Sequence, residues 1–427
     1  MKRMERLTFL KSAAAVSAFT ILKPVTAFGT RANSAIRVGI IGCGGRGTAV
    51  LSSMSQNTDI AIIAMADLFD DKLQNAHPIF NKLNTTKGLP EVPKTNIHQG
   101  SKAYLPLLNN KDVDAVLISS PCYSHPGYID AALAAGKHVY SEKPVAVDVA
   151  GCEQVVRLGE MVKGKLSLAI GFQIRFASAY VEMVRRIHQG DLGEMINAQL
   201  YYFSGGVPHK PYQNVSYDEA RIRNQYHFHA LSGGILLDQG IHILDVCNWA
   251  LQAHPVKATG SGGKRAGVDF GDAWTNYQVL YEYPDQVNVS FHGTQFGTQS
   301  GGVCARFIGT KGIAEAHYSG GVFIQGEKPW DSGIARCKDA ELTAEQRAAG
   351  IFLSSLHDAD TNKDFAFIKS IETGNFINEA RSGAESTLSA ILGRTAAAAG
   401  EEITWDEMIL SNARLDPMLN LSQFDKK

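Results

Sequence analysis

The sequence predicts an α/β protein in which a doubly wound parallel sheet is followed by an α+β domain built on a mainly antiparallel open sheet. Two observations predict the first part: short apolar runs at 36–41, 60–66 and 113–119 alternate with helix-compatible segments, and a glycine-rich turn follows the first run. A third observation predicts the second part. Residues 196–203 and 276–283 alternate polar and apolar side chains, as strands with one buried face do.

The first apolar run, 36–41, leads into the glycine-rich turn and then into a helix-compatible stretch, 48–55. Strand, turn and helix in this order, with G-x-G-x-x-G spacing, are the fingerprint of a Rossmann dinucleotide-binding domain. Gly42 makes the turn, Gly44 lets the backbone approach a pyrophosphate, and Gly47 lets the helix pack closely on the strand. The candidate cofactor-binding residues of the turn are Gly42, Gly44, Gly45, Arg46 and Gly47.

The second apolar run, 60–66, ends in Asp67, about 20 residues after Gly47. An acid in this place can accept hydrogen bonds from the adenosine ribose hydroxyls of a bound dinucleotide, and it repels a 2′-phosphate. We therefore predict that Asp67 binds the cofactor and that the cofactor is NAD rather than NADP. The alternative for Asp67 is an ordinary turn residue at the end of a strand.

Further polar residues stand where later strands of the parallel sheet are expected to end. Ligands of doubly wound sheets bind beyond these carboxyl ends. Ser119, His125, Glu142 and Lys143 all fall at such ends, and we predict that they contact the cofactor. For His125, a structural role beside Pro126 is an equal alternative.

The first 35 residues differ in character from the rest. Basic residues precede an apolar run, 12–22, and small residues follow near Ala27. This order is typical of a signal peptide, and the run is too short for the ~20 residues of a membrane span. Arg6 to Lys11 resembles a twin-arginine signal, but Leu7 stands in place of the second arginine, so the export route stays open. We predict an exported, periplasmic protein; a membrane-associated N-terminal helix is the alternative.

Composition restricts the remaining partners. The formal net charge is −1 and the pI is about 6.9, which does not suit a protein that follows a phosphate backbone, so we predict no nucleic-acid partner. No later segment is long and apolar enough to predict a stable membrane span. The six cysteines are scattered without a C-x-x-C pair, which favours buried thiols over a disulfide framework or a zinc ribbon.

The tripeptide Glu142-Lys143-Pro144, after a nucleotide-binding domain of this length, resembles the glucose-fructose oxidoreductase/inositol dehydrogenase/MocA (Gfo/Idh/MocA) family. The resemblance runs from about residue 36 to the end of the chain. It implies that Lys143 lies beside the nicotinamide and the substrate hydroxyl, and that the bond to Pro144 is cis. The proline also disfavours the helical region for Lys143.

A second motif, at 233–245, matches the G-G-x-x-x-D-x-G-x-H-x-x-D pattern of the same family. The resemblance implies that His242 is the general base and that Asp238 binds or orients the substrate, so with Lys143 they form the predicted catalytic group. On a regular helix, Asp238, His242 and Asp245 would share one face. For Asp245, a structural role in capping or pairing is an equal alternative to a role in the site. For His242, the alternative to the general base is a histidine buried in the core.

Four further residues are predicted to contact the substrate. Gln173 and Arg175 lie where family members place a polar residue near cofactor and substrate, and His227 and His229 lie in a stretch dense in polar aromatics. The H-x-H spacing could also bind a metal together with His242. We nevertheless predict no metal, because the enzymes of this family transfer a hydride without one.

Additional segments complete the predicted second domain. Residues 287–292 again alternate in polarity, and 364–400 is rich in alanine with helical periodicity. The resemblance implies that the open sheet forms the floor of a sugar site and a subunit interface, so we predict a homo-oligomer. The predicted division is 1–35 as signal peptide, 36–150 as NAD-binding Rossmann domain and 151–427 as substrate-binding α+β domain.

Together these features imply an NAD-dependent oxidoreductase that oxidises a secondary hydroxyl of a small-molecule carbohydrate, either a sugar or a glycoside. Ring C3 is the predicted position by resemblance to glycoside 3-dehydrogenases. One alternative is an NAD-dependent glycosidase that oxidises C3 transiently, eliminates the aglycone, adds water and reduces the product. The other is a protein that binds the cofactor without turnover.

Overall fold

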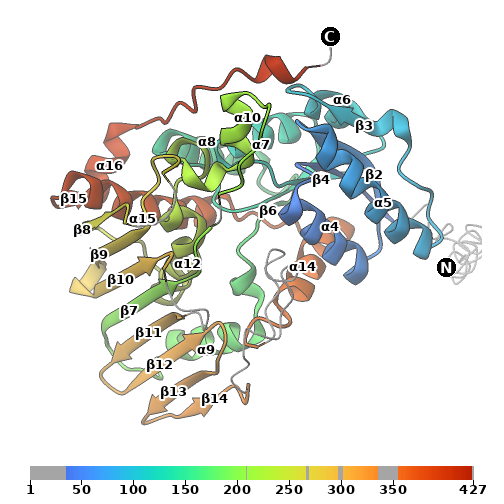
Figure 1. Ribbon diagram of the computed structural model, residues 1–427. Coiled ribbons are helices and arrows are strands. Elements are labelled where there is room, and N and C mark those ends of the chain that lie inside the picture. The colour runs from blue at the N-terminus through green and yellow to red at the C-terminus, as the bar shows by residue number, and fades with distance from the viewer. Residues whose placement is uncertain (1–34, 208, 266–268, 297–301, 335–353, 426–427) are drawn as a thin grey trace, which may run out of the picture. The chain divides into compact units, whose positions relative to one another are not determined.

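The computed structural model describes residues 35–207, 209–265, 269–296, 302–334 and 354–425. Residues 36–427 form one unit, and the fold described below belongs to it (Figure 1). The predicted signal peptide, 1–35, lies outside the described residues except for its last position. Within the described residues, no helix combines the length and apolar character that crossing a bilayer requires.

The first sheet contains six parallel strands in the order β3-β2-β1-β4-β5-β6, which is the strand order of a Rossmann fold. Its strands are β1 (Ile36–Ile41), β2 (Ile60–Asp67), β3 (Ile97–Gln99), β4 (Ala115–Ile118), β5 (His138–Ser141) and β6 (Leu168–Ile170). The helices between them are α4 (Gly45–Asn57), α5 (Asp70–Thr86), α6 (Tyr104–Asn109), α7 (His125–Ala134) and α8 (Val149–Val162). Because both faces of this sheet are covered, its strands are apolar runs rather than alternating ones.

The second sheet contains nine strands in the order β14-β13-β12-β11-β7-β10-β9-β8-β15. Only β7 and β10 are parallel neighbours; the other named pairs are antiparallel. The strands are β7 (Met195–Phe203), β8 (Lys257–Gly263), β9 (Asn276–Glu282), β10 (Asn288–Thr294), β11 (Val303–Gly309), β12 (Gly312–His317), β13 (Val322–Gly326), β14 (Trp330–Asp331) and β15 (Ile403–Thr404). Both sheets confirm the predicted fold class.

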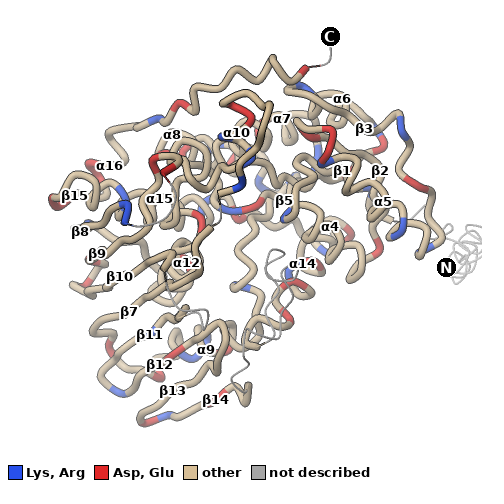
Figure 2. Tube along the Cα trace, viewed as in Figure 1, with Lys and Arg blue, Asp and Glu red and all other residues tan. Residues whose placement is uncertain are grey.

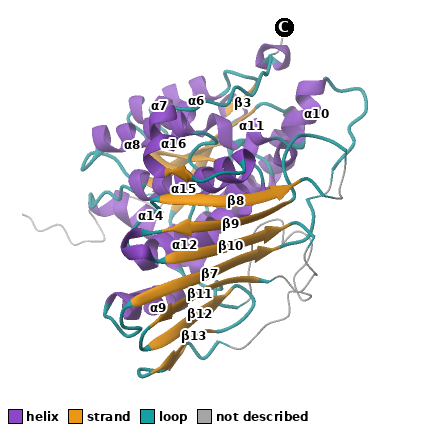
Figure 3. Cartoon of the chain, turned by 90° about the vertical axis from the view of Figure 1, so that its left-hand side faces the viewer, coloured by secondary structure: helices purple, strands orange, loops and turns teal. Residues whose placement is uncertain are grey.

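Helices cover one face of the second sheet only, and α9 (Ser178–His188), α12 (Ile241–Leu251) and α15 (Ala380–Ala399) pack against its strands. The other helices of this half are α10 (Tyr217–Arg223), α11 (His229–Ser232), α14 (Ala359–Thr373) and α16 (Trp405–Ser411). Single turns are η1 (Lys94–Asn96), η2 (Cys122–Ser124), η3 (Gln173–Phe176), η4 (Gln225–His227), η5 (Leu236–Gly240), η6 (Pro284–Gln286) and η8 (Leu421–Phe424). In Figure 3 the sheet face toward the viewer carries no helix of the described chain.

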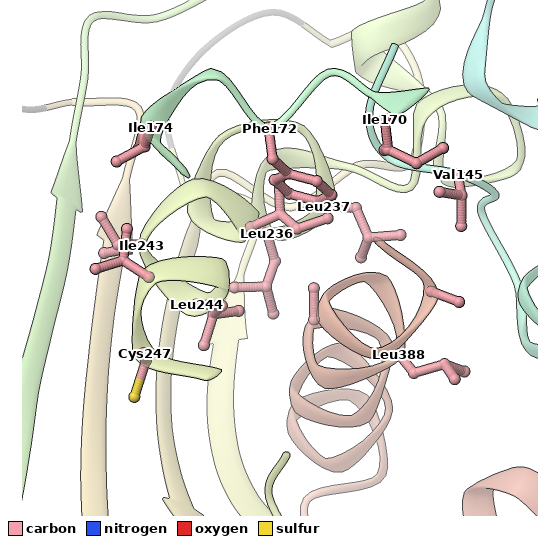
Figure 4. Close-up of a cluster of buried hydrophobic side chains, with 14 of the residues drawn as sticks. Val145, Ile170, Phe172, Ile174, Leu236, Leu237, Ile243, Leu244, Cys247 and Leu388 are labelled. Atoms are coloured by element: carbon pink, nitrogen blue, oxygen red, sulfur yellow. The ribbon is translucent and has the colours of Figure 1, made fainter. Parts of the chain in front are cut away.

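The helix that carries the second sequence motif is anchored in the largest core of the molecule. Leu237, Ile243 and Leu244 of η5 and α12 are buried and pack beside Phe172 and Leu388 (Figure 4). Almost every side chain of α12 is buried, so its rotation about its own axis is fixed by packing. The core therefore determines where the polar side chains of this helix point.

The second half of the chain also returns to brace the nucleotide-binding half. Helix α14 packs against α4, and the Asp364 carboxylate accepts hydrogen bonds from Ser53 at 2.6 Å and Asn57 at 3.0 Å. Basic and acidic residues are interspersed along the described chain (Figure 2), in line with the small net charge. The described cysteines are free, buried thiols, as predicted: Cys43, Cys122, Cys152, Cys247 and Cys304, whereas Cys337 lies outside the described residues.

The close approach at Gly47 gives a test of the first turn. A Cβ built on Gly47 collides with the carbonyl oxygen of Gly42, whereas a Cβ on Gly45 has no atom within 4 Å. We expect Gly47→Ala to lower the free energy of unfolding by about 1–3 kcal/mol or more, as overpacking does. Gly45→Ala serves as the control and leaves stability within about 0.5 kcal/mol, the usual range for changes without contacts. Urea unfolding measures both; equal stability of the two variants would contradict the assigned packing.

Candidate active site

The glycine turn lies between β1 and α4, and its glycines have two different tasks. Gly42 has a φ of +97°, and a Cβ there would lie 2.6 Å from the Ser119 carbonyl; Gly47 packs against the turn itself. Gly44 and Gly45 have no heavy atom within 4 Å of an added Cβ. The backbone at the start of α4 is therefore open to close approach at these two glycines, and this cradle suits a pyrophosphate bound at a helix N-terminus. The residues of this turn fit a dinucleotide.

Asp67 ends β2 directly beside this turn. Its Oδ2 accepts a hydrogen bond from the Cys43 backbone N–H at 2.7 Å, and its Oδ1 accepts one from the Phe69 N–H at 2.9 Å. Burial raises the pKa of the Asp67 carboxyl, and the two N–H donors oppose this effect. Since each carboxylate oxygen has a second lone pair, Asp67 can hold the turn and still accept from ribose hydroxyls. Asp67 can therefore be both a turn residue at the end of β2 and a contact of the cofactor.

Arg46 connects the turn to the ends of β5 and β6. Its Nε donates to Glu142 Oε1 at 3.1 Å, and its Nη2 donates to Gln173 Oε1 at 3.0 Å. Glu142 is buried and also accepts a hydrogen bond from the Tyr140 hydroxyl at 3.4 Å. Gln173, predicted as a substrate contact, is therefore part of the same network as the predicted cofactor residues Arg46 and Glu142.

Lys143 brings the two sequence motifs together. The Lys143–Pro144 bond is cis, as the family resemblance implied. The Lys143 Nζ donates to the Asp238 carbonyl oxygen at 2.5 Å and lies 3.7 Å from Asp238 Oδ1, across 95 positions of sequence. The predicted catalytic residues Lys143 and Asp238 are thus in direct contact.

The segment that carries Asp238 is not a regular α-helix. Residues 236–240 form a π-helical turn, η5, and α12 begins only at Ile241. Such wide turns occur mostly as single-turn insertions at functional sites. The turn changes the spacing on which the expected common face of Asp238, His242 and Asp245 depended. Asp245 instead accepts hydrogen bonds from Arg175 and Ser386 and is buried, so of the two alternatives raised for it, structural pairing is the one observed.

His242 is held as a neutral imidazole. Burial keeps the pKa of His242 well below its usual value, and the positive charges of Lys143 and Arg46 lower it further. The Nδ1 of the ring is buried and has no hydrogen-bond partner within the described part of the chain. Burial also raises the pKa of the neighbouring Asp238 carboxyl, while the Lys143 charge opposes that rise. The site therefore presents a neutral base next to an ammonium group.

The other predicted substrate contacts have partners elsewhere in the chain. Arg175 donates to both Asp245 oxygens, at 2.9 and 3.1 Å through Nε. The His229 ring contacts the Tyr277 hydroxyl at 3.4 Å, and burial, followed by the Arg394 charge, lowers the pKa of His229 to about 4. The His227 ring packs against those of His209 and Phe270. None of these contacts links Arg175, His227 or His229 to Lys143 or Asp238.

His125 is buried, and both of its ring nitrogens meet backbone carbonyls. Nδ1 lies 2.7 Å from the Pro144 oxygen, and Nε2 lies 2.9 Å from the Ser120 oxygen. The ring thereby ties the loop after β4 to the peptide that follows Lys143. Of the two alternatives raised for His125, the structure favours the structural one, because both nitrogens are already engaged.

Sequence reasoning missed two tyrosines near Asp238. The Asp238 charge is the largest cause that raises the pKa of Tyr226, which lies on η4 directly before the predicted substrate contact His227. Burial and then Asp238 raise the pKa of Tyr202 on β7. The stretch that the sequence analysis singled out for its polar aromatics, 225–229, contains Tyr226, but the H-x-H spacing drew attention to its histidines instead.

Two family models match the chain. One, described as an oxidoreductase family with an NAD-binding Rossmann fold, matches residues 36–170; the other, described as the GFO/IDH/MocA C-terminal domain, matches 180–315. An inositol 2-dehydrogenase of Klebsiella pneumoniae (strain 342) is 26% identical over 351 residues, 82% of this chain and 87% of that protein. An inositol 2-dehydrogenase of Acidothermus cellulolyticus is 26% identical over 243 residues, 56% of this chain and 60% of that protein.

Solved structures share the fold. The scyllo-inositol dehydrogenase of Lactobacillus casei with bound NAD(H) and scyllo-inositol superposes with a TM-score of 0.65 and 22% sequence identity. The superposition covers 87% of this chain and 99% of that one. A match of this extent includes both sheets.

The charge of Lys143 offers a test of the site's electrostatics. We expect Lys143→Met to raise the pKa of His242, because the ammonium group that opposes imidazole protonation is removed. Histidine side-chain NMR across a pH series measures this directly. His229 is the internal control, since burial and Arg394 rather than Lys143 lower its pKa. An unchanged His242 titration would show that Lys143 and His242 do not interact.

Proposed function

This chain belongs to the Gfo/Idh/MocA family of oxidoreductases, and we propose that it oxidises a secondary hydroxyl of a cyclic polyol, sugar or glycoside with NAD as its cofactor. The contact between Lys143 and Asp238 carries the proposal. It joins the E-K-P motif at the edge of the nucleotide-binding sheet to the helix that holds His242. The ammonium group of Lys143 thereby reaches the segment that holds His242, and its charge lowers the pKa of that imidazole.

His242, Lys143 and Asp238 have separate roles in the proposed reaction. NAD, when bound, supplies the hydride acceptor. His242 takes the proton of the reacting hydroxyl, which it can do because its depressed pKa keeps the imidazole unprotonated. The Lys143 ammonium stabilises negative charge that develops on the same oxygen. Asp238, with the hydroxyls of Tyr202 and Tyr226 near it, accepts hydrogen bonds from neighbouring ring hydroxyls.

The substrate class follows from this lining. Carboxylate, phenol and imidazole groups suit a ring with several hydroxyls, and the relatives named as inositol 2-dehydrogenases act on such a ring. We propose ring C3 of a sugar or glycoside as the oxidised position, by the same resemblance to glycoside 3-dehydrogenases. Inositol is the first substrate to compare with sugars and glycosides in an activity assay.

One observation favours a second candidate, an NAD-dependent glycosidase. Elimination of an aglycone after C3 oxidation needs an acid–base group in addition to His242. In this candidate the Tyr226 hydroxyl, whose pKa the Asp238 charge raises, is that group. In this cycle C3 is oxidised, the C2 proton and the aglycone leave, water adds, and C3 is reduced again, so no net oxidation remains.

Two proposals concern the cellular location and the oligomeric state of the protein. We propose export to the periplasm, supported by the charge order of residues 1–35. We also propose a homo-oligomer formed through the helix-free face of the second sheet (Figure 3). That face carries Leu280, which is 49% exposed.

Kinetics of site variants test the proposed function. We expect His242→Asn and Lys143→Met each to lower kcat about 10²–10⁴-fold, the usual contribution of a positioned acid–base group. His188→Asn, at the exposed end of α9, is the control and keeps full activity. NADH formation with inositols, free sugars and glycosides is the measurement.

Product analysis separates the candidates. A keto-product with one NADH per turnover supports the dehydrogenase, whereas free sugar without net NADH supports the glycosidase. Full activity of the His242→Asn and Lys143→Met variants would refute both and leave a cofactor-binding protein without turnover.

A further inference from the structure

A cluster of metal-ligand side chains lies on the helix-free face of the second sheet. Cys304 on β11 and His317 on β12 are register partners across the two antiparallel strands. Glu315 stands two positions before His317 and therefore points to the same face. The alternate residues Ala305 and Ala316 are buried on the opposite, helix-covered face. Three different donor atoms thus meet on two neighbouring strands.

The distances suit one small ion. Cys304 Sγ lies 3.7 Å from His317 Nε2, and that nitrogen lies 3.0 Å from Glu315 Oε2; all three atoms lie within 4.8 Å of one another. Around tetrahedral zinc, sulfur, nitrogen and oxygen ligands are separated by roughly 3.3–3.6 Å, given metal–ligand bonds of roughly 2.0–2.3 Å. Two of the three separations are therefore close to those of a zinc site.

Surrounding side chains hold the donors in place. Arg306 Nε donates to Glu315 Oε1 at 2.8 Å, which leaves Oε2 toward His317, and Arg306 Nη1 donates to Gln199 at 3.0 Å. Hydrogen bonds of this kind commonly orient the ligands of metal sites. Among the described residues, no other group of three or more histidine, cysteine or acidic side chains has this spacing.

We propose that Cys304, Glu315 and His317 bind one zinc ion, with water in the fourth position. On binding, the Cys304 thiol releases its proton to solvent, and His317 offers the Nε2 lone pair with its proton on Nδ1. Thiolate and imidazole favour zinc over magnesium or calcium. Glu315 and His317 are partly exposed in the single chain, with side-chain exposures of 17% and 29%, so the ion can enter before the proposed contact between subunits covers this face. This site is separate from the dinucleotide cradle.

Cobalt titration of the chelator-treated full chain tests the site. We expect one equivalent of Co²⁺ to produce a thiolate-to-cobalt charge-transfer band, and Zn²⁺ to displace it. Cys304→Ser should abolish the band, and His317→Gln should weaken binding at least tenfold. His292→Gln, on the same face but away from the cluster, is the matched control and binds as the parent does.

Zinc should also raise the melting temperature of the parent and of His292→Gln, but not of Cys304→Ser. Absence of the band in the parent, or its persistence in Cys304→Ser, overturns the proposal. If Cys304→Ser does not fold, the His317→Gln and Glu315→Gln variants decide, since unchanged cobalt affinity in both also overturns it.

A second inference comes from the C-terminal segment 412–425. After α16 this segment crosses α10 and reaches the nucleotide-binding half (Figure 1). Arg221 Nη2 donates to the Pro417 carbonyl at 2.7 Å. Asp425 accepts hydrogen bonds from the Ser101 N–H at 2.7 Å and the Ser101 hydroxyl at 3.0 Å.

This segment ends against the loops that flank Asp67. The Phe424 ring meets the Phe69 ring edge-on, with centroids 5.4 Å apart, and the Phe69 N–H donates to Asp67. On the other side, the Gly100 N–H donates to the Asp67 carbonyl oxygen at 3.1 Å, next to Ser101. Phe424 and Asp425 therefore contact the two loops that hydrogen-bond to Asp67, the predicted ribose-binding residue.

We infer that segment 412–425 slows the release of NAD by bracing the loops around Asp67; this rests on NAD binding as proposed above. The double variant Phe424→Ala/Asp425→Ala should release NAD at least tenfold faster in stopped-flow fluorescence, with kcat at saturating NAD unchanged. Asp406→Ala, on exposed α16, is the control.

Unchanged NAD release in the double variant overturns the inference but leaves the enzyme's proposed function intact. Failure of the parent chain to bind NAD would instead contradict the proposed function. Equal acceleration in Asp406→Ala would show a general loss of stability and would also overturn the inference.

Discussion

The hydrogen bond from the Lys143 ammonium to the Asp238 carbonyl is the contact on which the site depends. It joins the end of β5 to η5 and so ties the second half of the chain to the carboxyl end of the nucleotide-binding sheet. A partly buried ammonium group needs such partners, because an unpaired buried charge is costly. The same group sets the protonation of its neighbours. Lys143 and Arg46 lower the pKa of His242 beyond the effect of burial, and the Arg46 charge is balanced by Glu142.

Much of this arrangement could be predicted from local sequence. The glycine turn, Asp67 and the E-K-P motif each depend on a few adjacent residues whose backbone chemistry is nearly independent of the rest of the fold. Gly42 needs its positive φ, and Gly47 needs the absence of a Cβ. The apolar runs of the parallel sheet and the alternating strands of the second sheet likewise report directly on burial, so the fold class was predicted correctly.

The rest depends on tertiary contacts that sequence patterns do not encode. The 3.6-residue period of an α-helix predicted that Asp245 shares a face with Asp238 and His242. The π-helical turn η5 breaks that period, and Asp245 instead forms an ion pair with Arg175. The H-x-H pattern drew attention to two histidines, whereas the Asp238 charge acts on the pKa of Tyr226, the residue before them. His125 looked like a cofactor contact because it follows a strand, yet two backbone carbonyls occupy both ring nitrogens. In each case a partner distant in sequence determines the role.

The cradle is also braced from the far end of the chain. Asp364 on α14 holds Ser53 and Asn57 of α4, the helix that follows the glycine turn, and Asp425 holds the loop beside Asp67. A cradle fixed in this way loses little conformational freedom when a dinucleotide binds, so less of the binding energy is spent on ordering the protein. Because these braces lie beyond residue 350, the cradle is complete only in a chain whose second half is folded onto the first. A ligand that binds the complete cradle therefore stabilises the contacts between the two halves as well.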